Sequence, residues 1–365
     1  MTAHTVGSET APGARALSRH AIPGRAQRGP DRPEKSEDTM SNVEVDPVEI
    51  ACGEDRAEAD VELIPPREVP LGGPRAMLVR RTLPSRGRTM VGAWCFADHY
   101  GPDHVSETGG MVVPPHPHTG LQTVSWLFTG EIEHRDSLGT VAPVRPGELN
   151  LMTSGRGISH SEVSTAATDI LHGVQLWVAL PEEARGMAPE FENYVPEPYD
   201  DGAVRLAVFV GGLGLADGTR LTSPVRMHTP ILGAELTLCP GADVALAVDP
   251  AYEHGVLVDG GQVEVLGEVV PQGTLGYVAP GARQLRLRAG EHGARAVLLG
   301  GTPFGEQIVM WWNFIGRSHE EVVASREQWQ AEIGGAEAVQ FGRFDYDGDP
   351  LPAPGMPGVR LRPRG

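Results

Sequence analysis

Two short histidine-containing segments carry the residue types and spacing that best suit metal binding. The first is His116-Pro117-His118, and the second, further along the chain, is His160-Ser161-Glu162. In a β-strand, residues i and i+2 point to the same face and lie roughly 6.5–7 Å apart along the backbone. Each segment can therefore aim two donor atoms at one point from one side. On facing strands, the two segments would surround a cation with three imidazoles and one carboxylate.

Such a donor set suits an ion of Fe, Mn, Ni, Cu or Zn and leaves coordination positions open. Either segment alone is more often a surface pair or a satisfied core pair than a metal site. Glycines precede both segments, Gly110 before the first and Gly155 and Gly157 before the second. They allow the backbone to bend sharply where each segment begins. The combination favours metal binding over the purely structural interpretation.

The rest of the chain predicts an all-β fold that can position these segments. The 365 residues include 47 Gly and 32 Pro, so we expect frequent turns and few helices. From about Val61, short apolar runs bounded by Gly and Pro predict an antiparallel sandwich or barrel. A second series of such runs begins near Val204. At about 150 residues per domain, the length also points to two domains.

One helix is predicted near the C-terminal end. Ser318 is suited to the N-cap, and Glu321, three residues later, completes a capping box. Apolar residues, Trp329 and Ile333 among them, then recur at roughly helical spacing. Gly334 and its neighbouring glycine end the pattern, so the expected helix is short.

Longer motifs around the two histidine segments resemble those of a known family. Gly110-x5-His116-x-His118 resembles the first cupin motif. Five segments are similar to the signature of the pirin family: His116–Trp126, Gly130–Gly139, Met152–Glu162, Gln175–Pro181 and Leu298–Pro303. The likeness runs from about Leu63 to Gln330, which is nearly all of the chain expected to be ordered.

This resemblance implies a bicupin, with two cupin-type β-barrels in one chain, of which the first binds a metal ion, usually iron. Carried over residue by residue, the ligands are His116, His118, His160 and Glu162. The cofactor implied is one transition-metal ion, Fe first, with Mn, Ni, Cu or Zn as alternatives. Cupins generally have a ligand Glu shortly after H-x-H, where this chain has Gln122. Pirins supply the carboxylate from the second motif, at Glu162.

The other histidines are weaker candidates for metal binding. His134 and Asp136 belong to the signature, but we expect His134 to be a core histidine that fixes a turn beside Ser137. His228, His254 and His292 lie in the second half without any H-x-H, so we expect that barrel to bind no metal. We expect that barrel to pack against the first.

The expected organisation has five parts. Residues 1–60 are expected to be a disordered extension, and Met40 within it can be the true start. Residues 61–182 are the N-terminal metal-binding barrel, and 183–203 are the linker. Residues 204–345 are the C-terminal barrel plus helix, and 346–365 are a flexible tail.

The charge and apolar content of the chain limit the kinds of molecule that it is expected to bind. The net charge of −18 argues against direct nucleic-acid binding. No apolar stretch reaches the length of a membrane span, and no signal sequence opens the chain. The three cysteines are far apart, so we expect free thiols in a reducing cytoplasm.

Two classes of function remain open. Several proteins that the chain resembles are flavonol dioxygenases, which cleave quercetin with O2. In that case Glu162 would be the catalytic base, because it is the only carboxylate among the implied ligands and can accept the flavonol proton. The alternative is a non-enzymatic regulatory protein that responds to metal redox state and acts through protein partners.

Overall fold

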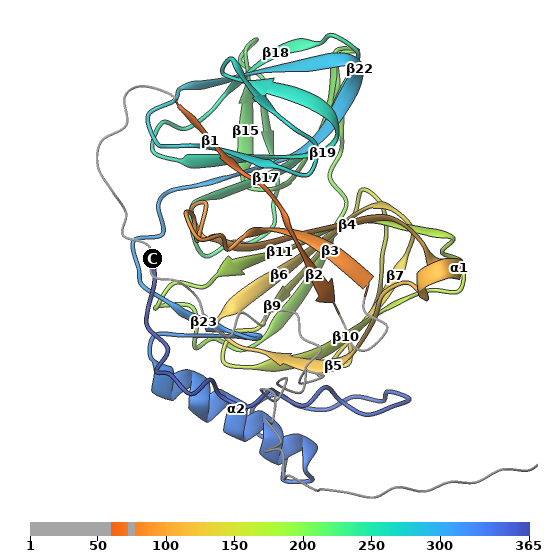
Figure 1. Ribbon diagram of the computed structural model, residues 1–365, viewed down its shortest axis with the longest axis vertical. Coiled ribbons are helices and arrows are strands. Elements are labelled where there is room, and N and C mark those ends of the chain that lie inside the picture. The colour runs from red at the N-terminus through yellow and green to blue at the C-terminus, as the bar shows by residue number, and fades with distance from the viewer. Residues whose placement is uncertain (1–59, 72–76) are drawn as a thin grey trace, which may run out of the picture. The chain divides into compact units, whose positions relative to one another are not determined.

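The computed structural model describes residues 60–71 and 77–365. The extension expected over residues 1–60 therefore lies outside the described residues, except for its last position, and so does Met40. As predicted, the described chain is built mostly from β-strands, which form two barrels that can be followed in Figure 1.

The first barrel consists of two antiparallel sheets. The larger sheet contains, in spatial order, β12 (Glu190–Tyr194), β9 (Leu149–Thr153), β6 (Leu121–Thr129), β11 (Ile170–Ala179), β4 (Trp94–His104), β3 (Met77–Leu83) and β2 (Arg67–Leu71). The smaller sheet contains β5 (Val112–His118), β10 (Ile158–Ser164), β7 (Ile132–Asp136) and β8 (Val141–Val144). A short helix, α1 (Val105–Thr108), follows β4.

The second barrel is formed by one large antiparallel sheet. Its main path is β1 (Val61–Ile64), β21 (Leu275–Val278), β19 (Glu253–Val265), β22 (Gln284–Gly301), β17 (Ile231–Leu238), β14 (Val204–Val210) and β13 (Tyr199–Asp200). Four more strands pair off this path: β15 (Gly212–Leu215), β16 (Arg220–Thr222), β18 (Asp243–Ala247) and β20 (Glu268–Val270). Strand β1 thus precedes the first barrel in sequence but pairs with a strand of the second.

The two barrels share a hydrophobic core. One cluster of buried side chains includes Trp94 and Trp126 from the first barrel and Phe209 and Leu299 from the second. The indole N–H of Trp94 also donates to the backbone carbonyls of Leu232 and Gly300, at 3.1 and 3.2 Å. Burial of this apolar surface stabilises the pair of barrels as one unit.

The C-terminal segment returns to the first barrel after completing the second. Strands β23 (Val309–Trp311) and β24 (Phe314–Gly316) pair with each other, and Ile315 N donates to the carbonyl of Thr119, just beyond β5, at 3.0 Å. Helix α2 (His319–Ile333) packs on these strands, as Figure 1 shows. Further on, Leu351 N donates to the carbonyl of Pro115 at 2.9 Å. The segment expected to form a flexible tail thus begins beside the strand that carries His116.

The predicted helix is confirmed with its expected cap. Ser318 is the N-cap of α2, and its hydroxyl accepts from the backbone N–H of Glu321 at 3.2 Å. Gly334 follows the last helical residue. Among the described residues, no helix is both long and apolar enough to span a membrane. Two cysteines are described, and both are free thiols: Cys95 is buried and Cys239 is exposed.

Candidate metal centre

Three neighbouring strands of the smaller sheet bring six polar side chains to one face. Strand β10 lies between β5 and β7. His160 on β10 pairs with His116 on β5 and with Asp136 on β7, while Glu162 pairs with His134 on β7. Because alternate residues share a face, His118 lies on the same side as His116. All six side chains are buried.

This face points into the first barrel, toward its larger sheet. The ring of His118 meets the ring of Trp177 on β11 edge to face, with centroids 5.2 Å apart. The hydroxyl of Ser125 on β6 donates to Glu162 Oε1 at 2.9 Å. The polar cluster therefore lies between the two sheets, where the surrounding strands fix its side chains.

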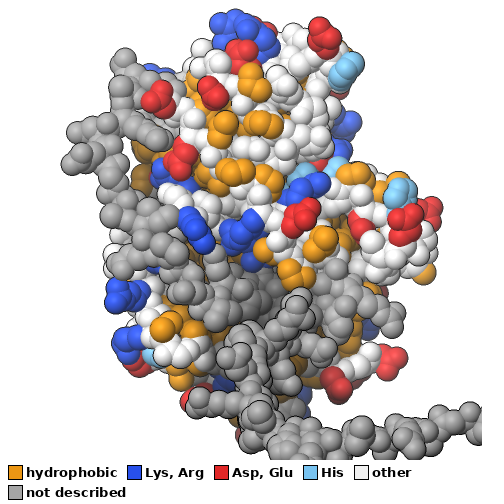
Figure 2. All heavy atoms as spheres, viewed as in Figure 1, with side chains coloured by type: hydrophobic (Ala, Val, Ile, Leu, Met, Phe, Trp, Pro, Cys, Tyr) orange, Lys and Arg blue, Asp and Glu red, His pale blue; other side chains and the backbone are white. Residues whose placement is uncertain are grey.

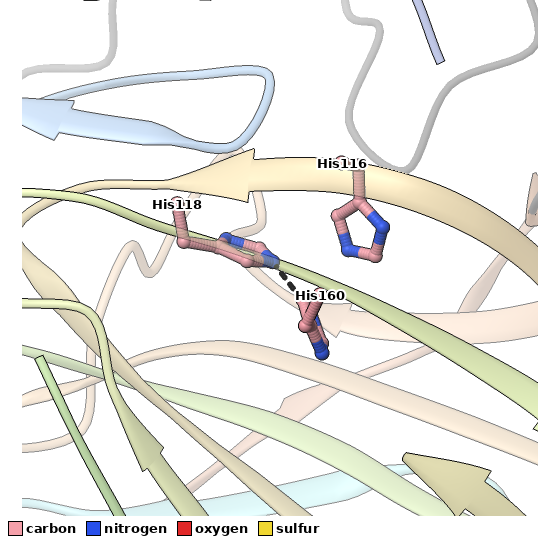
Figure 3. A group of neighbouring side chains, drawn as sticks. All are labelled: His116, His118 and His160. Atoms are coloured by element: carbon pink, nitrogen blue, oxygen red, sulfur yellow. Dashed lines mark hydrogen bonds between the residues drawn. The ribbon is translucent and has the colours of Figure 1, made fainter. Parts of the chain in front are cut away.

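Three of the four expected ligands converge. The candidate donor atoms of His116, His118 and His160 all lie within 4.8 Å of one another. Figure 3 shows the three rings turned toward a common region, with His118 Nε2 and His160 Nε2 3.1 Å apart. The i,i+2 spacing predicts that the two residues of each segment share one face of their strand, and the pairing of β5 with β10 brings the two segments together.

The fourth expected ligand belongs to an overlapping group. A carboxylate oxygen of Glu162 lies within 4.8 Å of donor atoms of His134 and His160, but Glu162 does not share the close group of His116 and His118. His160 is common to both groups. A single ion bound by all four expected ligands would therefore need donor atoms from both groups, which share only His160.

Burial keeps the imidazoles of this centre neutral. It lowers the pKa of His116 to about 4. The pKa values of His118 and His160 are lowered well below their ordinary value by burial and by repulsion from neighbouring imidazoles. Neutral imidazoles have a free lone pair, which is the form that binds a metal ion. Burial also raises the pKa of Glu162, against the effect of the Ser125 hydrogen bond.

The residues present fit a transition-metal ion. Imidazole nitrogens with one carboxylate suit Fe, Mn, Ni, Cu and Zn. The Nδ1 atom of His116 lies 2.9 Å from the carbonyl of Pro114, to which it can donate. This hydrogen bond places the proton of His116 on Nδ1 and leaves Nε2 free for a metal, a common arrangement for metal-binding histidines.

The glycines before the two segments bend the chain as predicted. Gly110 has φ +69° and Gly155 has φ +51°, a region that other residues rarely adopt. At Gly155 there is also no room for a side chain, because a Cβ would lie 2.2 Å from the carbonyl oxygen of Met187. Both bends thus depend on glycine.

Two further polar residues, Gln122 and His134, are buried near the centre. Gln122 is fully buried and donates to the hydroxyl of Thr153 at 2.9 Å. His134 is a buried histidine beside a turn, as expected, but its Nδ1 also lies 3.4 Å from Nδ1 of His160. No local motif predicts this second contact, because it depends on the register between β7 and β10.

A further buried cluster lies where the two barrels meet. The Nε2 atoms of His99 and His172, both from the first barrel, lie 2.6 and 2.5 Å from Oδ1 of Asp259, which belongs to the second. Arg295 Nε donates to Oδ2 of Asp259 at 2.5 Å. Arg80 also reaches His99, at 3.2 Å. Two guanidinium groups beside the cluster disfavour a cation there, so we interpret it as an ion-pair network.

Comparison of the sequence with known families gives two matches. The family profile described as Pirin matches residues 76–178, and the profile described as Pirin C-terminal cupin domain matches residues 233–333. The first match contains all four expected ligands. The second covers most of the strands of the second barrel and helix α2.

Individual relatives align over most of their length. A Pseudomonas aeruginosa protein that carries the provisional name quercetin 2,3-dioxygenase is 41% identical over 87% of this chain and 98% of its own. A pirin-like protein of Caulobacter vibrioides is 34% identical over 69% of this chain and 88% of its own. The crystal structure of a quercetin 2,3-dioxygenase from Acinetobacter baumannii superposes with a TM-score of 0.76 and 35% identity, and covers 83% of this chain and 97% of that one.

Proposed function

The chain belongs to the pirin family, and from this membership we propose that it is a metal-dependent dioxygenase that opens flavonols such as quercetin. The observation that carries the proposal is the convergence of His116, His118 and His160 inside the first barrel. The names of the Pseudomonas and Acinetobacter relatives support the flavonol as substrate class.

We assign one ion per chain to the ligands His116, His118, His160 and Glu162. Iron is our first choice, with manganese, nickel, copper and zinc as alternatives. The burial and neutrality of the histidines support this assignment, as does the position of Glu162 two residues beyond His160 on the same strand. The second barrel contributes no ligand in this proposal.

Glu162 is assigned as the catalytic base. When bound, the ion would supply Lewis acidity toward the 3-hydroxyl of the flavonol and help its electron density reach O2. Glu162 would accept the proton of that hydroxyl, because it is the only carboxylate among the proposed ligands. Ser125, which donates to Oε1, holds the carboxylate in place.

The overall reaction needs no external reductant. Both atoms of O2 enter the opened product, and one ring carbon leaves as carbon monoxide. The electrons taken up by O2 come from the flavonol itself. The chain therefore has to bind and orient the flavonol and remove its proton, and a buried site between two sheets excludes bulk water from these steps.

The test uses the purified full-length chain, freed of metal and reloaded separately with Fe, Mn, Ni, Cu and Zn. Metal content, quercetin loss, O2 uptake and carbon monoxide release are measured in the same samples. Turnover with at least one bound metal, with O2 and carbon monoxide in equal amounts, supports the proposal. If every metal binds and none gives turnover, the dioxygenase proposal is wrong, and the alternative of a regulatory protein that acts through protein partners takes its place.

A further inference from the structure

Three buried side chains form a hydrogen-bonded series that ends at a proposed metal ligand. Asp136 Oδ2 lies 3.2 Å from His134 Nε2. His134 Nδ1 lies 3.4 Å from His160 Nδ1. His160 Nε2, on the other side of that ring, faces His118 Nε2 at 3.1 Å. The three residues are each no more than 2% exposed.

The carboxylate at the start of the series fixes where the protons lie. The oxygen Oδ2 of Asp136 can only accept, so Nε2 of His134 carries a proton. When the ring carries only this proton, His134 Nδ1 has a lone pair and accepts from His160 Nδ1. The proton of His160 therefore lies on Nδ1, and the lone pair of Nε2 faces His118 and His116.

We propose that Asp136 and His134 are positioning residues that set the tautomer and ring orientation of His160, so that its Nε2 presents a lone pair to the metal. The inference rests on the proposed metal centre. Metal-bound histidines commonly donate their second N–H to a fixed acceptor, and loss of that acceptor typically weakens metal binding by about 10- to 100-fold. Pro114 plays the corresponding role for His116 through its backbone carbonyl.

Two other roles for His134 give different expectations. In a packing role, the ring matters because it lies against Phe191, with centroids 4.8 Å apart. In a ligand role, His134 would itself bind metal together with His160 and Glu162, whose donor atoms lie within 4.8 Å. The experiments below distinguish both roles from the proposed one.

The sharpest variant is Asp136→Asn. Oδ1 of Asp136 accepts from the backbone N–H groups of Leu138 and Thr140, at 2.8 and 3.1 Å. In the variant, these two N–H groups still donate to the single amide oxygen of Asn. Its NH2 group therefore takes the place of Oδ2 and faces His134. The proton of His134 then moves to Nδ1, and that of His160 moves to Nε2. The fold is retained, while the nitrogen needed for metal binding becomes protonated.

The first measurement uses metal-free protein and needs neither metal nor flavonol. In the parent chain, 15N chemical shifts of the ring nitrogens should show His134 protonated on Nε2 and His160 on Nδ1. Asp136→Asn should reverse both assignments. A parent chain with the opposite tautomers would overturn the inference and leave the proposed function intact.

The second measurement is the Zn²⁺ affinity of the full chain, by competition with a chromogenic chelator. Asp136→Asn and His134→Phe should each bind Zn²⁺ about 10- to 100-fold more weakly than the parent. His134→Asn should recover part of the loss, because its amide oxygen can accept from His160 Nδ1. A packing role predicts the reverse order for the His134 pair, since Phe preserves the ring contact, and this result would overturn the inference.

The third measurement separates positioning from direct ligation. In the Zn²⁺-loaded parent, the 15N shifts of His160 Nε2 should move to metal-bound values, while those of His134 should not. Metal-bound shifts at His134 would make it a ligand and overturn the inference. If the parent binds no Zn²⁺ or other transition metal, the proposed metal centre fails, whereas the tautomers of the metal-free chain still report on the series itself.

Discussion

The histidines of the candidate centre combine two properties that both disfavour protonation. Their imidazoles are packed closely enough to repel one another when protonated, and they are buried where charge is costly. Both effects lower the pKa values and keep lone pairs available at neutral pH. A metal ion can bind to these lone pairs, whereas additional protons are disfavoured by burial and by repulsion between the rings.

The first prediction concerns the centre of the ligand group. His118→Ala removes one of three converging imidazoles, so the metal content of the purified chain should fall sharply. The fold should persist, because the second barrel and the shared core are untouched. Metal analysis alongside circular dichroism checks this, with the exposed His104→Ala as a control that should keep its metal. Stoichiometric metal in His118→Ala would contradict the ligand assignment.

The second prediction concerns the proposed base. Glu162→Gln keeps the size of the side chain and one coordinating oxygen but loses the negative charge and the basic site. Flavonol turnover should fall by roughly 10²-fold or more, the usual scale for loss of a general base. Three histidines remain, so metal should bind with reduced affinity. Turnover must be divided by the metal content of the same sample, and an unchanged value would show that Glu162 is only a ligand.

The third prediction concerns His254, which lies in the second barrel, away from the metal centre. It is fully buried, and neither ring nitrogen has a hydrogen-bond partner among the described residues. Burial lowers its pKa to about 4, against about 6.5 in an unfolded chain. Between these values, only the unfolded chain binds the proton. His254 therefore makes the folded state less stable as the pH falls, by at most about 3 kcal/mol.

His254→Leu removes this titration, so the variant should lose less stability than the parent between pH 7 and pH 4. Urea unfolding at a series of pH values measures the difference. His292→Gln, at an exposed histidine, should follow the parent. Parallel pH profiles for the parent and His254→Leu would show that His254 does not titrate in this range.

At the residue scale, the sequence identified the two histidine segments but not their full surroundings. Spacing within one strand is a local property, so the shared faces of His116 with His118 and of His160 with Glu162 could be predicted. The approach of His134 to His160 depends on which strands pair and in what register. The Asp259 cluster depends on how two barrels pack, and no sequence motif connects its members.

At the scale of elements, the features that could be predicted are again those with a local sequence motif. Helix α2 begins and ends where its cap and glycines placed it. The pairing of β1 with β21 of the second barrel was not predicted, because strand partners far apart in sequence leave no local pattern. The same holds for β24, which carries the C-terminal segment back to the end of β5.

The fourth prediction tests the cap of α2. Ser318→Ala removes the hydroxyl that accepts from the N–H of Glu321, and loss of such a cap typically costs about 1 kcal/mol. Ser318→Asp should preserve stability, because a carboxylate also accepts this hydrogen bond and interacts favourably with the helix N-terminus. Urea unfolding of the three proteins checks the order. Equal losses in both variants would show that the hydroxyl does not act as a cap.

At the scale of the whole molecule, charged side chains lie both on the surface and at the buried junction of the two barrels. On the face shown in Figure 2, acidic and basic side chains are interspersed over the described surface. At the junction of the barrels, by contrast, Asp259 is buried between His99, His172 and Arg295. Burial alone would raise the pKa of Asp259, but hydrogen bonds from His172 and His99 outweigh it and hold the pKa well below its ordinary value.

The last prediction follows from this junction. Asp259→Asn keeps the side-chain shape but removes the buried charge that pairs with Arg295, whose side chain is 30% exposed, so the loss should be smaller than the value of about 3–5 kcal/mol that is typical of a fully buried pair. The loss should appear in a single unfolding transition, because the hydrophobic core is shared by both barrels. The matched control is Asp243→Asn, since Asp243 also pairs with two arginines, Arg286 and Arg288, but at the exposed surface, where such pairs contribute little.

The parent should also lose the contribution of Asp259 as the pH falls below about 4, the value for an unfolded aspartate, because its folded pKa is depressed. Asp259→Asn has no such carboxylate, so the difference between the two proteins should shrink with acid. Urea unfolding at pH 7 and at pH 3 measures this. Equal losses in Asp259→Asn and Asp243→Asn at pH 7, or two separate transitions in the parent, would show that the junction does not couple the barrels.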